Sequence, residues 1–215
     1  GKSVIQIDLK SSEGKTSFES LIKLTDVLLE SYRPGVMQRL GLGQDRLQQL
    51  NPGLIHCALT GYGQSGPRAQ DAGHDINYAA LAGGLANSGT ADRPIFNWPP
   101  VVDHAGAQQA SISILGALAS RRRVGSDGRG CFIDVAMFDC YLAWQDWGLT
   151  GARSGDAAEL PKREGNLLNG GAACYRLYGT SDNRFIALGA LEKKFWRNFC
   201  VAVEKPQWIE RQRNH

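Results

Sequence analysis

Apolar and polar positions alternate with two different periods along the first sixty residues. Short apolar runs mark expected strands, and between them apolar side chains recur at the spacing of one helix face. The predicted elements are a strand at 4–9, a helix whose apolar face is Phe18, Leu21, Ile22 and Leu24, an apolar run at 27–29, a polar helix at 45–50 and a strand at 54–59. This alternation predicts an α/β fold with parallel strands joined by right-handed crossovers. Because the first strand lies so close to residue 1, we also expect the chain to be part of a longer protein.

The rest of the chain has more turn residues and longer spacings between elements. Glycine and proline punctuate residues 61–100, whereas the helix expected at 105–122 is rich in Ala and Gly, which predicts close packing against another element. The other predicted elements are a short helix at 76–85, a strand at 131–137 leading into a helix that ends near 144, a polar crossover at 148–171, a strand at 185–188 and a helix at 193–203.

Composition and charge narrow the class of protein. With 42% hydrophobic and 21% charged residues over 215 positions, the chain is expected to fold around a core and not to be disordered. Its 24 Lys and Arg against 21 Asp and Glu leave a net charge of +3, too small to indicate a nucleic acid or a membrane surface as partner. No apolar run is long enough to span a membrane and the first residues do not resemble a signal peptide, so we expect a cytoplasmic protein.

The five cysteines lie far apart in the sequence; they are Cys57, Cys131, Cys140, Cys174 and Cys200. A structural zinc site needs clustered ligands, and a disulfide framework usually needs an even number of cysteines in a short secreted chain. We therefore expect buried thiols in a reducing compartment and no bound metal.

A glycine-rich segment, TGYGQSGP at residues 60–67, directly follows the strand expected at 54–59. Loops that follow parallel strands lie at the carboxyl edge of the sheet, where α/β proteins bind ligands. Glycine lets backbone N–H groups approach a ligand closely, although a plain connecting turn has the same composition. A dinucleotide site is not expected, because no clear helix follows these glycines.

Two further positions could carry chemistry, and each has an ordinary structural alternative. His74 follows Gly73 at an expected helix start, where the helix dipole would favour the neutral imidazole. Asp103 precedes the helix expected at 105–122, whose N–H groups would keep the carboxylate ionised as a base or a nucleophile. Alternatively, Asp75 and Asp103 are helix N-caps and His74 is a surface turn residue.

Several motifs in one order carry a resemblance to a known family. They are ESYRPGVMQRLGLG at 30–43, the glycine loop at 60–67, GHDINY at 73–78, Asp103 with its Ala-rich helix, residues 128–137, GTSDNR at 179–184 and GALE at 189–192. The chain resembles the family III CoA-transferases, which include formyl-CoA and carnitine CoA-transferases and the α-methylacyl-CoA racemases. This resemblance covers nearly the whole chain.

The resemblance implies an α/β fold with an incomplete Rossmann-like parallel sheet domain and part of a smaller second domain. The implied divisions are 1–147 for the large CoA-binding domain without its N-terminal part, 148–171 for a crossover linker, and 172–215 for the start of a small domain without its C-terminal part. The resemblance also implies an interlaced homodimer, in which each chain threads through its partner.

The resemblance further implies an acyl-CoA substrate, with no cofactor beyond the CoA of that substrate. Arg33 and Arg39 match family positions near the CoA phosphates, and guanidinium groups suit bidentate phosphate contacts. Ordinary solvated charges are the alternative for both arginines. The implied CoA-binding residues are Arg33, Arg39, Gly61, Tyr62, Gly63 and Gly73.

Asp103 matches the family's catalytic aspartate in both the racemases and the transferases. In racemisation, which we favour, His74 and Asp103 exchange the α-proton of a 2-methylacyl-CoA, and Glu192 orients the histidine. In CoA transfer, Asp103 attacks the thioester carbonyl and forms an acyl anhydride on the way to a new CoA thioester. A third alternative is an inactive fragment.

Two departures from the racemase pattern lie close to Asp103. Racemases of the family usually carry Asn four residues before the aspartate, where this chain has Pro99, with Asn97 two residues away. Their glycine-rich run after the aspartate is replaced by a segment that contains Gln108 and Gln109. These departures concern the acyl pocket more than the binding of CoA.

Overall fold

The computed structural model describes residues 1–146, 148–150 and 162–214. The chain forms two compact units, the first from Gly1–Tyr78 and Pro99–Ala143, the second from Ala79–Trp98 and Trp144–His215. Residues 79–98 therefore group with the C-terminal part, although the predicted large domain at 1–147 included them. The division into 1–147, 148–171 and 172–215 stays a prediction, and residues 151–161 of the predicted linker lie outside the described residues.

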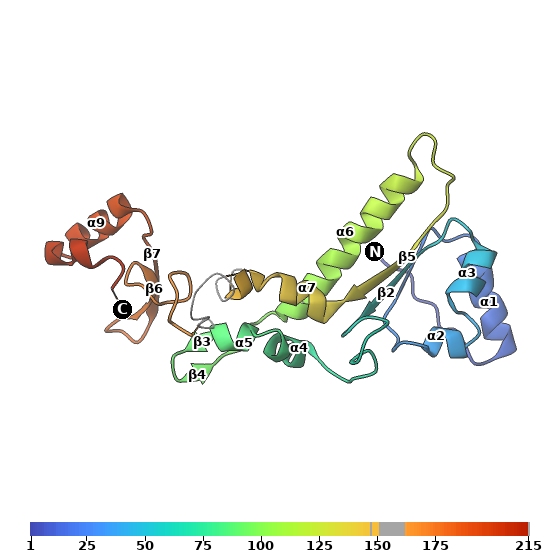
Figure 1. Ribbon diagram of the computed structural model, residues 1–215, viewed down its shortest axis with the longest axis horizontal. Helices are drawn as coiled ribbons and strands as arrows, with labels where there is room; N and C mark the ends of the chain where they lie inside the picture. Colours follow the sequence, from blue (N-terminus) through green and yellow to red (C-terminus); the bar gives the residue numbers. More distant parts are fainter. Residues whose placement is uncertain (147, 151–161, 215) are drawn as a thin grey trace. The chain divides into compact units, whose positions relative to one another are not determined.

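A parallel sheet of three strands organises the first unit (Figure 1). The strands are β1 (Val27–Glu30), β2 (Ile55–Thr60) and β5 (Phe132–Ala136), in the order β1-β2-β5. In their register, Val27 lies opposite Ile55, and Cys57 lies opposite Ile133. The middle strand β2 is buried along nearly all its length, as expected for a parallel strand that is covered on both faces. The predicted parallel sheet of an α/β fold is confirmed.

Helices pack around this sheet and supply the rest of its core. They are α1 (Ser12–Ile22), α2 (Val36–Arg39), α3 (Gln44–Leu50), the start of α4 (Asp75–Leu81), α6 (Val101–Arg121) and α7 (Met137–Ala143). The Ser11 hydroxyl caps α1 by accepting a hydrogen bond of 3.0 Å from the Gly14 N–H. Ile22 of α1 and Leu47 of α3 are buried in one cluster, so the helices predicted at both places are confirmed.

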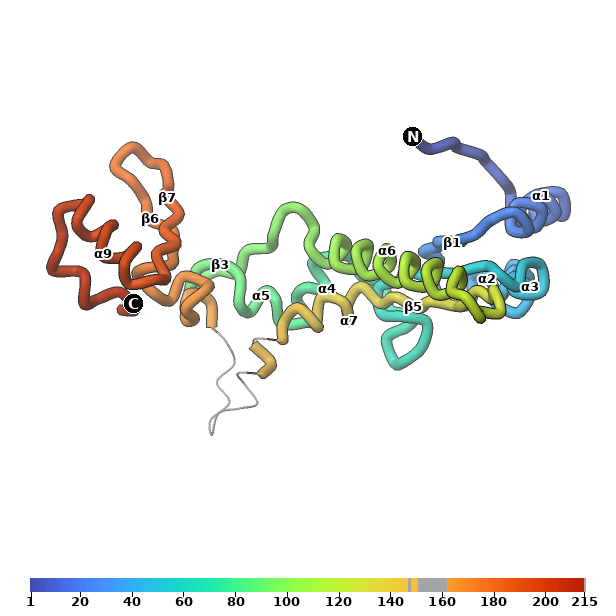
Figure 2. Tube along the Cα trace, turned by 90° about the horizontal axis from the view of Figure 1, so that it is seen from above, coloured from blue at the N-terminus to red at the C-terminus, as the bar shows by residue number. Residues whose placement is uncertain are grey.

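The strand predicted at 4–9 is wrong. These residues form no strand, and the side chains of Val4 and Ile5 are 96% and 68% exposed. Figure 2 shows the chain reaching α1 from the N-terminus along a path separate from that of β1. A strand needs a hydrogen-bonded neighbour, and β1 pairs only with β2 in the described sheet. The alternating pattern alone therefore did not determine the conformation of this segment.

The longest described helix, α6, lies against β2, β5 and α7 (Figures 1 and 2). Close approach requires Gly106, because a β-carbon there would lie 2.6 Å from Met137 Cγ and 3.2 Å from Leu59 Cδ1. The close packing predicted from its small residues is thus confirmed. The helix begins at Val101 and not near 105, so Asp103 lies inside its first turn. Neither α6 nor any other described helix has the length and apolarity needed to cross a membrane.

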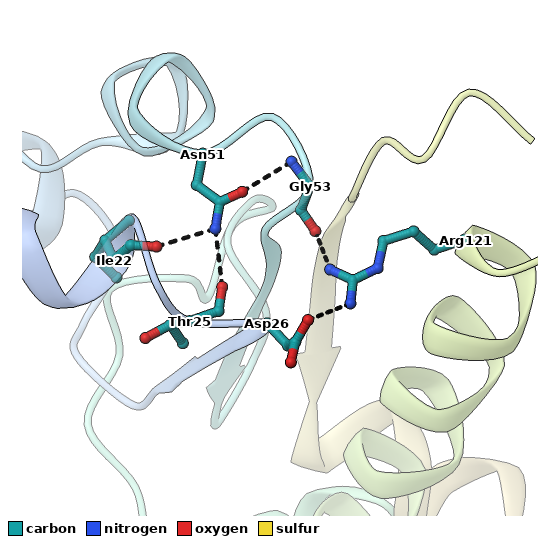
Figure 3. A network of polar contacts seen from close by, with 6 residues as sticks. All are labelled: Ile22, Thr25, Asp26, Asn51, Gly53 and Arg121. Atoms are coloured by element: carbon teal, nitrogen blue, oxygen red, sulfur yellow. Dashed lines mark hydrogen bonds and ion pairs between the residues drawn. The ribbon is translucent and has the colours of Figure 1, made fainter.

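A polar network near the end of α6 joins several segments of the first unit (Figure 3). The Arg121 guanidinium donates hydrogen bonds to the Gly53 carbonyl oxygen and to the Asp26 carboxylate. The Asn51 side-chain amide donates to two main-chain oxygens at and just after the end of α1, at 3.0 and 2.8 Å. The network lies where β1 and β2 begin, so it stabilises the edge of the sheet opposite to the carboxyl edge.

The second unit contains two short antiparallel strand pairs and one longer helix. Its elements are α5 (Gly84–Asn87), β3 (Gly89–Thr90), β4 (Arg93–Pro94), β6 (Tyr175–Gly179), β7 (Phe185–Gly189), α9 (Lys193–Ala202) and the 3-10 helix η1 (Pro206–Arg211). The strand predicted at 185–188 and the helix predicted at 193–203 are confirmed, whereas its partner strand β6 was not predicted. The helix predicted at 76–85 is divided at Gly83, where a φ of +83° separates α4 from α5.

Candidate functional site

The carboxyl edge of the parallel sheet carries the loops that contain most of the predicted site residues. β1 ends at Glu30, just before the turn that contains Arg33. β2 ends at Thr60, where the glycine loop begins. α6 starts at this edge and runs back to the Arg121 network at the other one, so Asp103 in its first turn lies beside both loops.

Asp103 is exposed and faces a hollow on the outer surface of α6. The volume of this hollow is about 570 Å³, and its lining residues are Asp103, His104, Ala107, Gln108, Ser111 and Ile112. Gln108, which departs from the racemase pattern, therefore lies along the same hollow as the carboxylate. The remaining lining residues are apolar at Ala107 and Ile112 and polar at Gln108 and Ser111. This lining suits a small ligand that has both apolar and polar groups.

The start of α6 is capped by a carboxylate from another element. The backbone N–H groups of Val102 and Asp103 donate hydrogen bonds of 2.7 and 3.1 Å to Asp75 Oδ1. The N-cap position itself is Pro100, which offers no side-chain acceptor. The alternative in which Asp103 is the N-cap is therefore wrong. The side chain of Asp75, from α4, caps the first turn of α6.

The surroundings of Asp103 raise its pKa. Burial has the largest effect, and the negative charge of Asp75 raises the pKa further, whereas His104 and His74 lower it. The helix N–H groups that were expected to favour the ionised form of Asp103 bond Asp75 instead, and burial raises the pKa of Asp103. A carboxylate with a raised pKa is a better proton acceptor, which suits a general base.

His74 lies in the turn between the glycine loop and α4, and its side chain is exposed. Its N–H donates a hydrogen bond of 3.0 Å to Asn77 Oδ1, and its carbonyl oxygen accepts from the Asn77 N–H at 2.9 Å. These contacts fix the backbone of the turn. The effect of His74 on the pKa of Asp103 places both side chains in one electrostatic environment.

Tyr78 holds the two glycine-containing turns together. Its hydroxyl donates a hydrogen bond of 2.7 Å to the Gly73 carbonyl oxygen, and its ring meets Tyr62 edge to face at 5.0 Å. A β-carbon at Gly61 would lie 2.3 Å from the Tyr78 hydroxyl oxygen, and one at Gly73 would lie 2.5 Å from the ring. Glycine is required at both positions because the buried ring occupies the space of a side chain.

The glycine loop is also anchored to β5 and α7. The N–H of Gln64 donates to both carboxylate oxygens of Asp134, at 3.2 and 3.0 Å. The Phe138 N–H donates to the Gly61 carbonyl oxygen at 3.0 Å, and Gly63 has a φ of +83° that favours glycine. The loop therefore has a defined conformation at the carboxyl edge.

Arg33 precedes the short helix α2 and Arg39 is its last residue, and both arginines are exposed. Burial raises the pKa of the Tyr78 hydroxyl, Tyr62 and Asp103 raise it further, and Arg33 lowers it. Arg33 therefore shares the electrostatic environment of Asp103. Arg39 Nη1 lies beside Gly35, where a β-carbon would be 3.1 Å away.

Glu192 belongs to the second unit, where it is the exposed N-cap residue of α9. The first unit thus brings His74, Asp103, Arg33 and the glycine loop to one edge, and Glu192 is part of a different unit. Its predicted role in orienting His74 stays a prediction.

Three residues of this edge were not singled out as functional from the sequence, namely Asp75 as a cap of α6, Tyr78 and Asp134. Tyr78 occurs four residues after His74, the spacing of one helix face, which was a usable signal. Asp134 is the one charged side chain in β5, and such a charge in an apolar strand is also a usable signal. Nothing in the sequence connected Asp75 with residues 27 and 28 positions later.

The cysteines differ in their exposure. Cys57, Cys174 and Cys200 are buried as expected, Cys140 is half-buried, and Cys131 is exposed, against expectation. Burial raises the pKa of Cys57 to about 11, so this thiol stays protonated at neutral pH and is a poor nucleophile. The described residues include no group of three potential metal ligands, and the expectation of no bound metal stays a prediction.

The fold and the site define an α/β protein with a carboxylate and a histidine beside a glycine loop, at the carboxyl edge of a parallel sheet. Residues 1–215 match the sequence model of CoA-transferase family III, and the chain belongs to that family. The resemblance seen in the sequence motifs is confirmed.

Relatives of the chain include both branches of the family. It is 39% identical to the α-methylacyl-CoA racemase of Homo sapiens over 91% of its length, and 31% identical to the succinyl-CoA–D-citramalate CoA-transferase of Chloroflexus aurantiacus over 96%. The chain spans 50% of the length of each of these relatives. A CaiB/BaiF family protein from Brucella suis has the same fold, with a TM-score of 0.79 and 24% identity over 96% of this chain and 53% of that one.

Proposed function

We propose that the complete protein acts on acyl-CoA thioesters through Asp103. The observation that carries this proposal is a carboxylate of raised pKa that faces a hollow and lies near enough to His74 and Tyr78 for their charges to interact. Family membership supports CoA as the carrier of the acyl group. Arg33 and Arg39 would bind the CoA phosphates, and the glycine loop with Tyr62 would lie along the CoA moiety.

The reaction we favour is racemisation of a 2-methylacyl-CoA. One of the pair His74 and Asp103 removes the α-proton, and the electrons of that C–H bond move to the thioester carbonyl as an enolate. The other member of the pair then donates a proton to the opposite face of the same carbon, which inverts it. Glu192 would orient the imidazole. The shared electrostatic environment of Asp103 and His74, together with the likeness to a racemase, supports this choice.

The alternative reaction is CoA transfer between an acyl-CoA and a carboxylic acid. Here an Asp103 oxygen attacks the thioester carbonyl, the C–S bond breaks, and CoA thiolate leaves an acyl anhydride on the enzyme. CoA thiolate then attacks the Asp103 carbonyl carbon of this anhydride, the donor acid leaves as its carboxylate, and a thioester between Asp103 and CoA remains. The acceptor carboxylate attacks that thioester to form a second anhydride and release CoA thiolate, which adds to the acceptor's carbonyl carbon and frees the Asp103 carboxylate as the new acyl-CoA forms. The polar Gln108 in the hollow and the likeness to a CoA-transferase favour this alternative.

Hydrogen exchange distinguishes the two reactions. When the complete protein is incubated with a 2-methylacyl-CoA in D2O, we expect deuterium at the α-carbon, measured by mass spectrometry. His74→Ala and Asp103→Ala are each expected to reduce the exchange rate by about 10²–10⁴-fold, because each removes one proton carrier. Asp127→Asn, in an exposed turn distant from the site, is the matched control and should exchange like the wild type.

Two outcomes would replace the favoured reaction. If no exchange occurs and hydroxylamine traps an acyl group on Asp103, the protein is a CoA-transferase. If Asp103→Ala retains the wild-type rate of either reaction, Asp103 is not part of the site.

We also propose that the complete protein is a homodimer in the cytoplasm. Ile112 and Leu115 on the outer surface of α6 are each 65% exposed, which is unusual for neighbouring apolar side chains of one helix. A second copy of the chain that covers this face would remove them from water. The five free cysteines support a reducing compartment.

A further inference from the structure

Asp75 links the turn of His74 to the first turn of α6. Its Oδ1 atom accepts hydrogen bonds from the N–H groups of Val102 and Asp103, at 2.7 and 3.1 Å. Asp75 itself is the first residue of α4, directly after His74. One carboxylate therefore fixes the distance between the backbones that carry the two proposed catalytic side chains.

Among the described residues, no other side chain bonds the first N–H groups of α6. Pro100 occupies the N-cap position of α6 and makes no side-chain cap bond. The side chain of Asn77 bonds the N–H of His74 and so serves the turn before α4. The first N–H groups of a helix need an acceptor, and α6 obtains two of its acceptor contacts from Asp75.

The charge of Asp75 also acts on Asp103. Two carboxylates that are close together disfavour the ionised form of each other, and the pKa of Asp103 is raised by Asp75 after the larger effect of burial. The other groups that face Asp103 are His74 and His104, which lower its pKa, and the hydroxyl of Tyr78. In addition, the N–H groups bonded to Asp75 cannot stabilise the Asp103 anion.

We propose that Asp75 is a positioning residue, whose side chain caps α6, places Asp103 and sets a negative charge beside it. This proposal rests on the proposed function in one respect only, namely that Asp103 is the reacting carboxylate. The Asp75 side chain performs this role without contact with a substrate.

The test separates the charge of Asp75 from its hydrogen bonds. Asp75→Asn keeps an oxygen acceptor but removes the charge, and Asp75→Ala removes both. In the complete protein labelled with ¹³C-aspartate, the Asp103 carboxyl signal is assigned by its loss in Asp103→Asn and then titrated. Asp75→Asn should move its midpoint to lower pH by about 0.5–1 unit, since a like charge is lost.

Kinetics supply the second measurement. Asp75→Asn should lower kcat at neutral pH by about threefold to tenfold and shift the acid limb of the pH profile downward, with KM within about twofold of wild type. Asp75→Ala should lower kcat further because the first turn of α6 is also uncapped. Asp71→Asn, an exposed carboxylate paired with Arg68, is the matched control and should leave titration and kcat unchanged.

The titration is independent of turnover. If the protein catalyses neither exchange nor CoA transfer, the proposed function fails while the Asp103 midpoint still tests the coupling. An Asp103 midpoint that is the same in wild type and Asp75→Asn overturns the charge effect. Wild-type kcat in Asp75→Ala overturns the positioning role.

Discussion

At the scale of single residues, the site depends on the steric fit around Tyr78 and on the charges close to Asp103. The Tyr78 ring of α4 occupies the space next to Gly61 and Gly73, so it holds the two turns that contain these glycines together. Burial raises the pKa of the Asp103 carboxyl, and the negative charge of Asp75 raises it further. This arrangement costs stability at neutral pH, as expected of groups placed for chemistry and not for folding.

The raised pKa of Asp103 predicts a pH-dependent effect on stability. The pKa of Asp103 is higher in the folded protein than its reference value of 3.8, so the folded protein binds this proton more tightly than the unfolded chain. The resulting contribution to stability is present at low pH and is lost as the pH rises through the folded pKa. Asp103→Asn should therefore be more stable than wild type at pH 7, and the difference should shrink as pH falls toward 4. Urea unfolding at several pH values measures both. A variant less stable than wild type at pH 7 would contradict the burial argument.

At the scale of elements, the network at the starting edge of the sheet connects helices to strands. Asn51 follows α3 and precedes β2, and its amide bonds the end of α1 while its Oδ1 accepts from the Gly53 N–H at 3.0 Å. Arg121 at the end of α6 bonds the same Gly53 (Figure 3). Because α6 is held at this end by Arg121 and at the other by Asp75, its rotation and position along the sheet are defined at both ends.

Asn51→Ala should lower the free energy of unfolding by about 2–3 kcal/mol, because three hydrogen bonds of partly buried groups are lost together. Urea unfolding of the complete protein measures this change. Arg46→Ala, which removes only an exposed ion pair with Glu19, is the comparison and should have a much smaller effect. Equal stability of the two variants would show that the Asn51 bonds are replaced by water without cost.

At the scale of the whole molecule, the first unit has large apolar side chains on its surface that a monomer would normally bury. Leu115 on α6 is 65% exposed, and Leu29 at the outer strand β1 is 54% exposed. β1 has a partner on one side only in the described sheet, so its other edge offers unpaired backbone groups. In the complete protein these surfaces are expected to be covered by further chain or by a second copy.

A charge placed on the outer face of α6 tests the proposed homodimer. The complete protein should sediment at twice its chain mass, and Leu115→Glu should raise the dissociation constant of the dimer by about tenfold or more, because an unpaired charge would be buried. Val124→Glu changes a fully exposed residue in the turn after α6 and should leave the dimer intact. A wild-type monomer, or a Leu115→Glu dimer of unchanged affinity, would exclude this face as the interface.

The sequence by itself determined the elements whose pattern is local. Helix periodicity around Phe18 and at 45–50, the buried run at 54–59 and the small residues before Arg121 predicted the parallel sheet and the close packing of α6. The family motifs led to CoA-transferase family III, because several motifs in one order are specific even where each alone is weak. The predictions of helices and strands succeeded because each depends on neighbours within a few residues.

Only the tertiary structure decided the features that depend on distant partners. Residues 4–9 alternate like a strand but have no strand to pair with, so they remain outside the sheet. Helix N–H groups were expected to favour the ionised form of Asp103, yet they bond the side chain of Asp75, the first residue of α4. Burial raises the pKa of Asp103. Hydrogen bonding and burial are set by what packs nearby in space, and that information is absent from the spacing of residues along the chain.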